Sequence, residues 1–343
     1  MRSVLRDGGT LASEYPLIFD EAFTGSFVNA EVGDDVRATC ATIVRELVTP
    51  AATFRVGLIG SVATDPDWRG RGLASEVLHS AQAAHTESGC VFSILWADDP
   101  TFYLKRGYLP LGAELDFRVQ PDKLRLLPAT DGVRKAKPAD LHRIQMLYEA
   151  HPERVNRSET ETAVLLEAPD LELLVCDANG DVAAYSCLGR GMDFTNVVHE
   201  WGGDPKHVLA LVRAHMTRRA FRGDTSELYL MAPPSASALR DSMALAEAPS
   251  ARGVLGMGRI ASLSAAADLL ARVIGDGAEV RTGDAEVSVR GPDGERMLDV
   301  EELLQVLCAG EGDRTQVKAL EEATGLELPK LPLTPFVWGL DSI

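Results

Sequence analysis

The sequence has few cysteines and no long apolar run. Its 343 residues include five widely scattered cysteines and no C-x-x-C pair, so neither a disulfide framework nor a zinc knuckle is indicated. No stretch of about 18 uncharged apolar residues occurs, and the first residues lack the apolar core and cleavage site of a signal peptide. We therefore expect a cytoplasmic protein that is neither exported nor membrane-spanning.

Positive charge is also scarce. Lysine and arginine number 34 against 51 aspartates and glutamates, which gives a formal net charge of −17 at pH 7. An acidic surface repels phosphate backbones and anionic lipid headgroups, so nucleic acids and membrane surfaces are poor candidates as partners. The charge is explained either by solubility or by an acidic field that attracts a cationic acceptor.

The spacing of the histidines gives no sign of a metal site. His79 and His85 lie six residues apart, and His207 and His215 lie eight apart. Two histidines that bind one metal ion on a helix stand at positions i and i+4 instead. We therefore predict that the protein holds no metal.

The overall composition is that of a folded protein. Hydrophobic residues make up 45% and charged residues 25%, which excludes a fibrous or wholly disordered chain. At roughly 100 to 200 residues per domain, the length predicts two or three domains. The composition turns to Lys, Arg, Pro and Asp around residues 121–138, which marks a first boundary. The predicted domains are residues 1–125, 126–255 and 256–343.

Hydrophobic periodicity predicts alternating strands and helices in the first domain. Three strands are expected at residues 27–32, 36–48 and 53–64, the first two joined as a hairpin. Apolar residues at helical spacing then predict a helix from Gly72 to about residue 88. A strand at 91–97, a brief helix at 101–106 and a further strand follow. This order is typical of an α/β or α+β unit.

The other two predicted domains show the same kind of pattern. In the second we expect strands at 133–137, 171–177, 182–188 and 227–232, and helices at 140–150, 161–167, 207–220 and 237–248. In the third we expect helices at 265–274 and 300–307, strands at 279–282 and 285–290, and a mobile loop at 310–313. The second domain thus repeats the element order of the first.

A glycine-rich turn between the strand at 53–64 and the following helix is the most informative feature. Such a turn exposes unpaired N–H groups beside the positive end of the helix dipole, which is typical of a pyrophosphate cradle. Gly70 and Gly72 allow the backbone to approach a ligand closely, and Arg69 and Arg71 add positive charge. An ordinary turn with solvated arginines is the alternative. The turn lacks both G-x-G-x-x-G and G-K-[ST], so neither nicotinamide nor nucleoside triphosphate chemistry is supported.

Two segments carry a family resemblance. Arg69-x-x-Gly72-x-Ala74 matches the [QR]-x-x-G-x-[GA] acyl-CoA signature of the GNAT superfamily of N-acetyltransferases. Residues 94–108 resemble the second signature of that family, in which a helix with an aromatic residue and Tyr103 is followed by Gly107 and Tyr108. The two signatures stand in the expected order, and the resemblance covers roughly residues 26–118.

The resemblance implies a fold, a cofactor and a set of binding residues. The fold would be α+β, with a mixed, mostly antiparallel sheet flanked by helices, and the co-substrate would be acetyl-CoA. The turn would bind the CoA pyrophosphate, while backbone amides of the preceding strand would hold the pantetheine arm and polarise the thioester carbonyl. The residues that would bind the cofactor are Val62, Ala63, Thr64, Arg69, Gly70, Arg71, Gly72, Leu73, Ala74, Ser75, Asp98 and Asp99.

A narrower resemblance is to the enhanced-intracellular-survival (Eis-like) group of these enzymes. That group has a catalytic GNAT domain, a second degenerate GNAT-like domain and a sterol-carrier-like C-terminal domain. In the second predicted domain, residues 200–205 have no arginine and Pro205 opens the helix, so we expect no CoA there and a scaffolding role. The first predicted strand is preceded by about 26 residues, fewer than the first strand and two helices of the family require. The candidate acceptors are therefore lysine side chains, aminoglycosides, polyamines and small metabolite amines.

The resemblance also implies two catalytic residues. Tyr103 would be the general acid that protonates the leaving thiolate; the alternative is a tyrosine that packs beside Phe102. The terminal carboxylate, carried by Ile343 in this sequence, would take the proton of the attacking amine. The alternative is a tail that packs on the C-terminal core with its carboxylate in solvent. Trp68 and Trp96 either wall a pocket or belong to the core.

We therefore predict an N-acetyltransferase that transfers an acyl group directly from the CoA thioester to a primary amine, either a small molecule or a lysine side chain. Cys90 has no histidine partner within reach along the sequence, which disfavours a covalent acyl-cysteine intermediate. The competing hypothesis is a non-catalytic acyl-CoA or lipid-binding protein. Because multi-domain relatives commonly assemble, a homo-oligomer is also considered.

Overall fold

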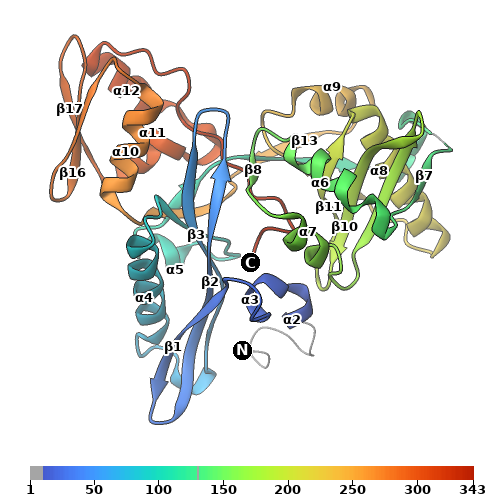
Figure 1. The fold of residues 1–343 in the computed structure, drawn as a ribbon, viewed down its shortest axis with the longest axis horizontal. Helices are drawn as coiled ribbons and strands as arrows, with labels where there is room; N and C mark the ends of the chain where they lie inside the picture. Colours follow the sequence, from blue (N-terminus) through green and yellow to red (C-terminus); the bar gives the residue numbers. More distant parts are fainter. Residues whose placement is uncertain (1–10, 130) are drawn as a thin grey trace.

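The computed structural model describes residues 11–129 and 131–343 (Figure 1). Within these residues the strands form sheets of seven, seven and three strands, which we call sheets A, B and C. Helices pack on each sheet, and both antiparallel and parallel strand pairs occur. The predicted α+β class is therefore confirmed.

Sheet A contains most strands of the first predicted domain. Its path is β1-β2-β3-β4-β14-β5, with β8 (Arg154–Val155) beside β2. The elements of this part of the chain are β1 (Ser26–Val32), β2 (Asp35–Val48), β3 (Thr53–Thr64), a 3₁₀ turn (Pro66–Trp68), α4 (Leu73–Glu87), β4 (Phe92–Leu95), α5 (Thr101–Leu104) and β5 (Leu109–Leu111). Strands β1, β2 and β3 are antiparallel, whereas β4 runs parallel to β3. These elements agree with the sequence expectation to within a few residues.

Apolar side chains hold helices on both faces of sheet A. On one face, Val77, Leu78 and Ala81 of α4 are buried in a cluster with Cys40 and Ile59 of the sheet. Full burial of each large apolar side chain contributes about 1.5 to 3 kcal/mol. On the other face lie two short helices, α2 (Leu11–Glu14) and α3 (Pro16–Phe19), and α3 contacts β2.

Sheet B follows the path β13-β6-β12-β11-β10-β9-β7. Its strands are β6 (Glu114–Val119), β7 (Val133–Lys135), β9 (Glu172–Ala178), β10 (Asp181–Arg190), β11 (Asp193–Gly203), β12 (Leu228–Ala232) and β13 (Ser250–Gly253). Its helices are α6 (Leu141–Glu149), α7 (Glu159–Leu165), α8 (Pro205–Phe221) and α9 (Ser237–Leu245), with 3₁₀ turns at Pro121–Leu126 and Pro138–Asp140. Strands β9, β10 and β11 are antiparallel, and β12 is parallel to β11. With α8 between β11 and β12, this part repeats the order and strand directions of β1-β2-β3-α4-β4.

Strand β11 was not predicted from the sequence. Its pairing with β10 shifts register after Cys187 and again after Leu188, so the side-chain alternation is interrupted. The strand also ends on Gly202 and Gly203, and glycine weakens a strand signal. The irregular register therefore hides this strand from a period-two pattern.

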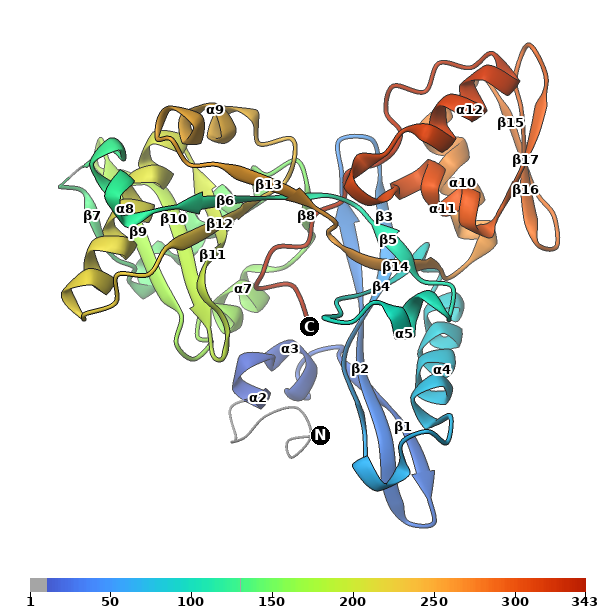
Figure 2. The same cartoon turned by 180° about the vertical axis from the view of Figure 1, so that it is seen from behind.

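Two strands cross between the parts of the chain that the predicted boundaries separate (Figure 2). Strand β6 lies before residue 125 but pairs with β12 and β13 in sheet B. Strand β14 (Gly256–Ile260) lies after residue 255 but pairs with β4 and β5 in sheet A. The division at 125 and 255 stays a prediction, but the backbone pairing joins the segments on either side of both positions.

The third part of the chain packs helices on the small sheet C. Its elements are α10 (Leu263–Ile274), β15 (Glu279–Thr282), β16 (Glu286–Arg290), β17 (Glu295–Asp299), α11 (Val300–Cys308), a 3₁₀ turn (Gly310–Gly312) and α12 (Thr315–Thr324). Strand β17 and helix α12 were not predicted. The segment expected to be a mobile loop is instead tied to sheet A, because Glu311 donates its backbone N–H to the carbonyl of Gly112 at 2.8 Å.

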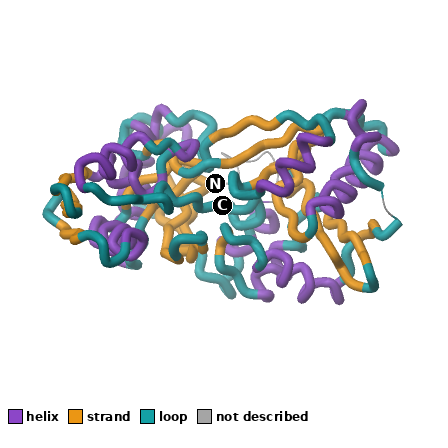
Figure 3. The backbone as a smooth tube through the Cα atoms, turned by 90° about the horizontal axis from the view of Figure 1, so that it is seen from above, coloured by secondary structure: helices purple, strands orange, loops and turns teal. Residues whose placement is uncertain are grey.

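After α12 the chain runs back and ends between sheets A and B (Figures 1 and 3). Phe336, Val337, Trp338 and Leu340 of this last segment are buried in the main core. Among the described residues, none of the helices has both the length and the apolar character needed to cross a bilayer.

Candidate active site

Strands β3 and β4 separate partway along their length. Their parallel pairing covers Val56–Ile59 against Phe92–Leu95, and residues 60–64 of β3 have no partner on β4. At the same place β3 bulges against β2, since Ala41 pairs with Gly60 and Thr39 with Ala63. Ser61 within the bulge has a positive φ of 51°. The result is an opening in sheet A, bordered on one side by the end of β3.

The turn after β3 leads into α4 with its first N–H groups uncapped. Gly70 and Gly72 have φ values of 77° and 87°, a region that favours glycine. Gly72 is the N-cap and supplies no side-chain cap. A Cβ built at either glycine would meet no atom within 4 Å, so open space adjoins the turn. Uncapped N–H groups facing open space at a helix start form a site for an anion.

The opening and the turn line one groove of about 680 Å³. Its lining consists of Val62, Ala63, Thr64, Trp68, Arg69, Gly70, Gly72, Leu73, Ala74, Ser75, Phe102, Tyr103 and Arg106. All the predicted cofactor-binding residues are therefore brought together here except Arg71, Asp98 and Asp99. Trp68 lies in the groove wall, whereas Trp96 is packed against the core.

Arg106 is a groove residue that the sequence analysis missed. Its Nε and Nη2 donate to Ser75 Oγ at 3.0 and 2.7 Å, and its guanidinium lies 3.5 Å from the centre of the Phe102 ring. These contacts hold a positive charge beside the first turn of α4. The available signal was its position in the second signature segment, four residues after Phe102, which puts both side chains on one side of a helical turn.

Three residues that were predicted to bind the cofactor, Arg71, Asp98 and Asp99, do not line the groove. The Arg71 guanidinium lies 4.4 Å from the centre of the Trp68 ring. Asp99 accepts a hydrogen bond from the backbone N–H of Thr101 at 2.9 Å, and hydrogen bonding to Thr101 lowers the pKa of Asp99. Asp98 lies in the same turn, beside Asp99. Their contact with a cofactor stays a prediction.

Tyr103 lies in the wall of the groove on α5. Its ring packs edge-on against Phe102 and Tyr108, at centre distances of 5.0 and 6.0 Å. Burial raises the pKa of Tyr103 above its ordinary value of 10, and the neighbouring Cys40 thiol raises it further. The hydroxyl therefore carries its proton at neutral pH. Tyr108 is 1% exposed and does not line the groove.

Ile343 reaches β3 at Gly60. A Cβ built on Gly60 would lie 2.3 Å from both the main-chain carbon and the oxygen of Ile343, so only glycine fits there. Ile343 packs against the main core, while Tyr103 packs against the separate cluster under α4. The two predicted catalytic residues therefore approach β3 from different sides. Ile343 borders a second, small cavity of about 10 Å³, together with Tyr15, Leu17 and Arg190.

Comparison with solved structures shows the class of fold. A protein from Enterococcus faecalis V583, described as a probable N-acyltransferase, superposes with a TM-score of 0.68 at 12% identity over 98% of this chain and 94% of that one. A GCN5-related N-acetyltransferase from Anabaena variabilis gives 0.66 at 13% identity, over 100% and 95% of the two chains. Eis1 from Mycobacterium abscessus gives 0.57 at 16% identity, over 91% and 89%. This chain therefore has the same fold as these proteins over nearly its whole length.

A family match defines the first part of the chain more closely. Residues 6–111 match the acetyltransferase (GNAT) domain. The part of the chain that forms the groove is thus similar to an acetyltransferase domain, and this match supports acyl transfer from a CoA thioester to an amine. No curated protein sequence matches the chain.

Proposed function

We propose that the protein transfers an acetyl group from acetyl-CoA directly to a primary amine. The observation that carries the proposal is the groove, in which the open end of β3, the uncapped start of α4 and Tyr103 meet. The first two features fit the long polar arm and the diphosphate of CoA, and the third supplies a proton donor beside them.

Each part of the groove has a role in this proposal. The N–H groups at the start of α4, with Arg69 and Arg106, bind the diphosphate. Backbone N–H groups between Val62 and Thr64 hold the thioester carbonyl and stabilise the negative charge that develops on its oxygen. One such donor typically contributes about 3 kcal/mol to the transition state.

Proton transfers complete the reaction. The amine nitrogen forms a bond to the carbonyl carbon while the carbon–sulfur bond breaks, and Tyr103 gives its proton to the departing thiolate. The tyrosine phenol, with a pKa of about 10 or more, is a weaker acid than the CoA thiol, whose pKa is near 8.5. The proton transfer to the thiolate is therefore a short-lived step, after which solvent restores the proton of the tyrosine. A carboxylate at the position of Ile343 is proposed to take the amine proton, directly or through water.

The rest of the chain is proposed to support this site. Residues 126–255 are assigned as a degenerate second GNAT-like domain without a cofactor site, because Pro205 opens α8 and the side chain of Asp204 accepts a hydrogen bond from the backbone N–H of Lys206. Residues 256–343 are assigned as a sterol-carrier-like domain on the basis of the sequence resemblance.

The proposal is tested by following free CoA thiol with acetyl-CoA and a panel of primary amines, which includes lysine peptides, polyamines and aminoglycosides. Release of thiol that depends on one class of amine, together with detection of the acetylated amine by mass spectrometry, is the expected result. Calorimetry on the same protein measures acetyl-CoA binding. Binding without turnover on every amine would favour the acyl-CoA-binding alternative, and absence of binding would refute both.

A further inference from the structure

The last segment of the chain, residues 336–343, fills a place in sheet B that corresponds to the groove in sheet A. We call this segment the tail. Parallel pairing of β11 with β12 stops at Val198, and β11 bulges at the next residue, His199. Gly339 of the tail donates its N–H to the carbonyl of His199 at 3.1 Å, and Trp338 packs edge-on against Trp201 of β11.

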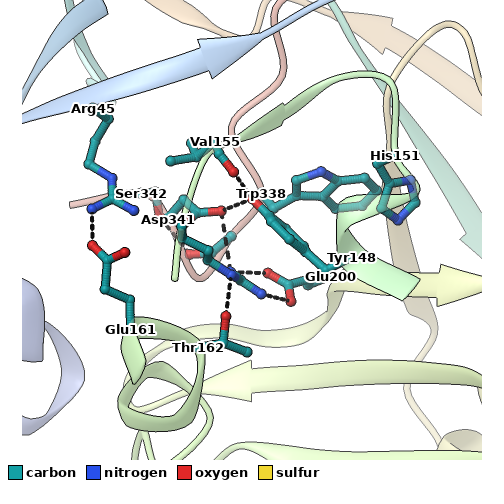
Figure 4. A network of polar contacts seen from close by, with 12 residues as sticks. Arg45, Tyr148, His151, Val155, Glu161, Thr162, Glu200, Trp338, Asp341 and Ser342 are labelled. Carbon is teal, nitrogen blue, oxygen red and sulfur yellow. Dashed lines mark hydrogen bonds and ion pairs between the residues drawn. The ribbon is translucent and has the colours of Figure 1, made fainter. Parts of the chain in front are cut away.

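A buried set of charged groups holds the tail in this place (Figure 4). The Arg157 guanidinium donates to both carboxylate oxygens of Glu200, at 2.9 and 2.6 Å, and to Asp341 Oδ2 at 3.3 Å. The hydroxyl of Tyr148 lies 2.7 Å from the same oxygen of Asp341. The side chains of Arg157, Glu200 and Asp341 are fully buried.

A second arginine, at the end of β10 in sheet B, also holds the tail and connects it to α2. Arg190 donates from Nη1 to the carbonyls of Gly339 and Ser342, at 2.6 and 3.0 Å. Its Nε donates to the carbonyl of Glu14 at 2.9 Å, at the end of α2. The tail is therefore fixed both to the core of sheet B and to the short helices that cover sheet A.

The tail ends at the active-site strand. Ile343 follows Asp341 by two residues and lies against Gly60, directly before the bulge of β3 whose next residues line the groove. A shift of Asp341 would therefore move the contact of Ile343 with β3. Arg157 joins Asp341 of the tail to Glu200 of β11, so this cluster sets the position of the tail relative to sheet B.

We propose that Arg157 and Asp341 are positioning residues for the acyl transfer, which hold the tail so that its end forms a wall of the active site at Gly60 of β3. This inference rests on the proposed function. The attacking amine must reach the thioester carbon in a narrow range of positions, and a misplacement of about 1 Å can cost about 100-fold in rate. Sheet B thus contributes to catalysis without a cofactor of its own.

The test compares two substitutions of Asp341. Asp341→Ala removes the oxygen that Arg157 and Tyr148 contact, and we expect kcat for the preferred amine to fall about 100-fold, while the dissociation constant of acetyl-CoA stays within twofold. Asp341→Asn keeps an acceptor oxygen and should restore kcat to within about fivefold of the parent protein, because the charge of Arg157 stays paired with Glu200. Equal kcat in the parent and Asp341→Ala would overturn the inference.

A matched control separates position from stability. Asp224 also holds a buried arginine, since it accepts from Nε of Arg219 in α8 at 2.8 Å. Asp224→Ala should lower the melting temperature without changing kcat. Hydrogen exchange of residues 60–64 should rise in Asp341→Ala and not in Asp224→Ala. If exchange and kcat respond equally in both variants, the effect is general destabilisation and the inference fails.

Two further measurements keep the test decisive. If Asp341→Ala does not fold, Arg157→Lys is used instead, because lysine keeps the charge but loses the bidentate contact with Glu200. In this variant kcat should again fall while acetyl-CoA binding is preserved. An unchanged kcat would overturn the inference. Tyr103→Phe is assayed in parallel. Loss of turnover in Tyr103→Phe with normal kcat in the tail variants would refute only the positioning role, whereas a parent protein without turnover on any amine would refute the proposed function.

Discussion

Helices α4 and α8 occupy the same place in sheets A and B, each after a bulged strand and before a strand parallel to it, yet their first turns differ. The start of α4 has two glycines with positive φ and no side-chain cap. At the start of α8, Pro205 lacks an N–H, and Asp204 accepts a hydrogen bond from the N–H of Lys206 at 2.9 Å. An anion needs N–H groups that no local carboxylate has taken, so of these two helix starts the start of α4 is the better suited to a phosphate.

The openings beside these two helices also differ, because the one in sheet A is empty of chain and the one in sheet B is filled by the tail. Next to β3 the chain leaves a groove of about 680 Å³. Next to β11 the tail is hydrogen-bonded at His199 and packed against Trp201. One opening can therefore accept a ligand from solution, whereas the other already holds a segment of its own chain. Changes at each opening should consequently affect activity in different ways.

The largest effect is expected from Tyr103→Phe. Tyr103 lines the groove on α5, while α9, the helix after β12, has no tyrosine. Loss of a general acid typically costs 10²- to 10⁴-fold, so kcat should fall at least about 100-fold with acetyl-CoA affinity nearly unchanged. Steady-state kinetics and calorimetry measure the two quantities. The control is Tyr229→Phe in β12, whose hydroxyl contacts Glu227, and unaltered turnover in Tyr103→Phe would contradict the assignment.

A second change replaces the first residues of α4 with the residue types found at the start of α8, where Asp204 is the N-cap and Pro205 is the first helical residue. The double substitution Gly72→Asp with Leu73→Pro adds a carboxylate and removes an N–H where the diphosphate is proposed to bind. Acetyl-CoA affinity measured by calorimetry should fall about 100-fold, because roughly two charge-assisted contacts of 1.5 kcal/mol or more are lost.

Gly33→Asp is the matched control for this change. Gly33 also has a positive φ, 64°, and open space around it, but it lies in the turn between β1 and β2. Gly33→Asp should therefore strain the backbone to a similar degree, but it should not lower the affinity for acetyl-CoA. Retained affinity in the double variant would place the diphosphate elsewhere.

Local patterns explain which parts of the structure could be predicted from sequence. Period-two and helical patterns located β1, β2, β3 and α4, and the short signatures located most of the groove lining, because each depends on residues close together in the sequence. The crossing of β6 and β14 could not be predicted, since strand pairing over more than a hundred residues leaves no local signal.

The charged cluster behind the tail was missed for the same reason. Arg157, Glu200 and Asp341 are far apart in sequence, and each is by itself an unremarkable polar residue that a composition-based reading assigns to the surface. Only their common burial makes them a unit. Arg106 was missed although it stands in a recognised segment, because its role depends on its contact with Ser75 of α4.

A third expectation concerns a buried histidine in each of the two helices. His85 of α4 has Ser93 Oγ at 2.8 Å from Nδ1, whereas His215 of α8 has a carboxylate oxygen of Glu172 at 2.7 Å. Burial lowers the pKa of His85 from 6.5 to about 4. The pKa of His215 is lowered by burial too, but Glu172 opposes the shift.

Acid should therefore weaken the fold through His85 more than through His215. The unfolded chain, with a histidine pKa near 6.5, binds a proton that folded His85 resists, so this contribution to stability is complete above about pH 6.5 and is lost as the pH falls toward 4. The loss between pH 7 and 5 is about 2 kcal/mol. Denaturant unfolding at these pH values should show a flatter pH dependence in His85→Gln than in His215→Gln, and the reverse order would contradict this account.

The smallest effect is expected from the arginines beside α4. Arg106 is held by Ser75 in the groove wall, whereas Arg71 lies on Trp68 outside it, and residues 200–205 before α8 contain no arginine. Arg106→Met should raise the dissociation constant of acetyl-CoA about tenfold, the value of one charge-assisted contact, and Arg71→Met should raise it less. Because the attraction is between charges, the difference between the two variants should shrink when the salt concentration rises from 0.05 to about 0.5 M. An equal loss of acetyl-CoA affinity in the two variants would mean that the Arg71 side chain leaves Trp68 and reaches the diphosphate. Arg71 would then be a binding residue, as the sequence analysis predicts.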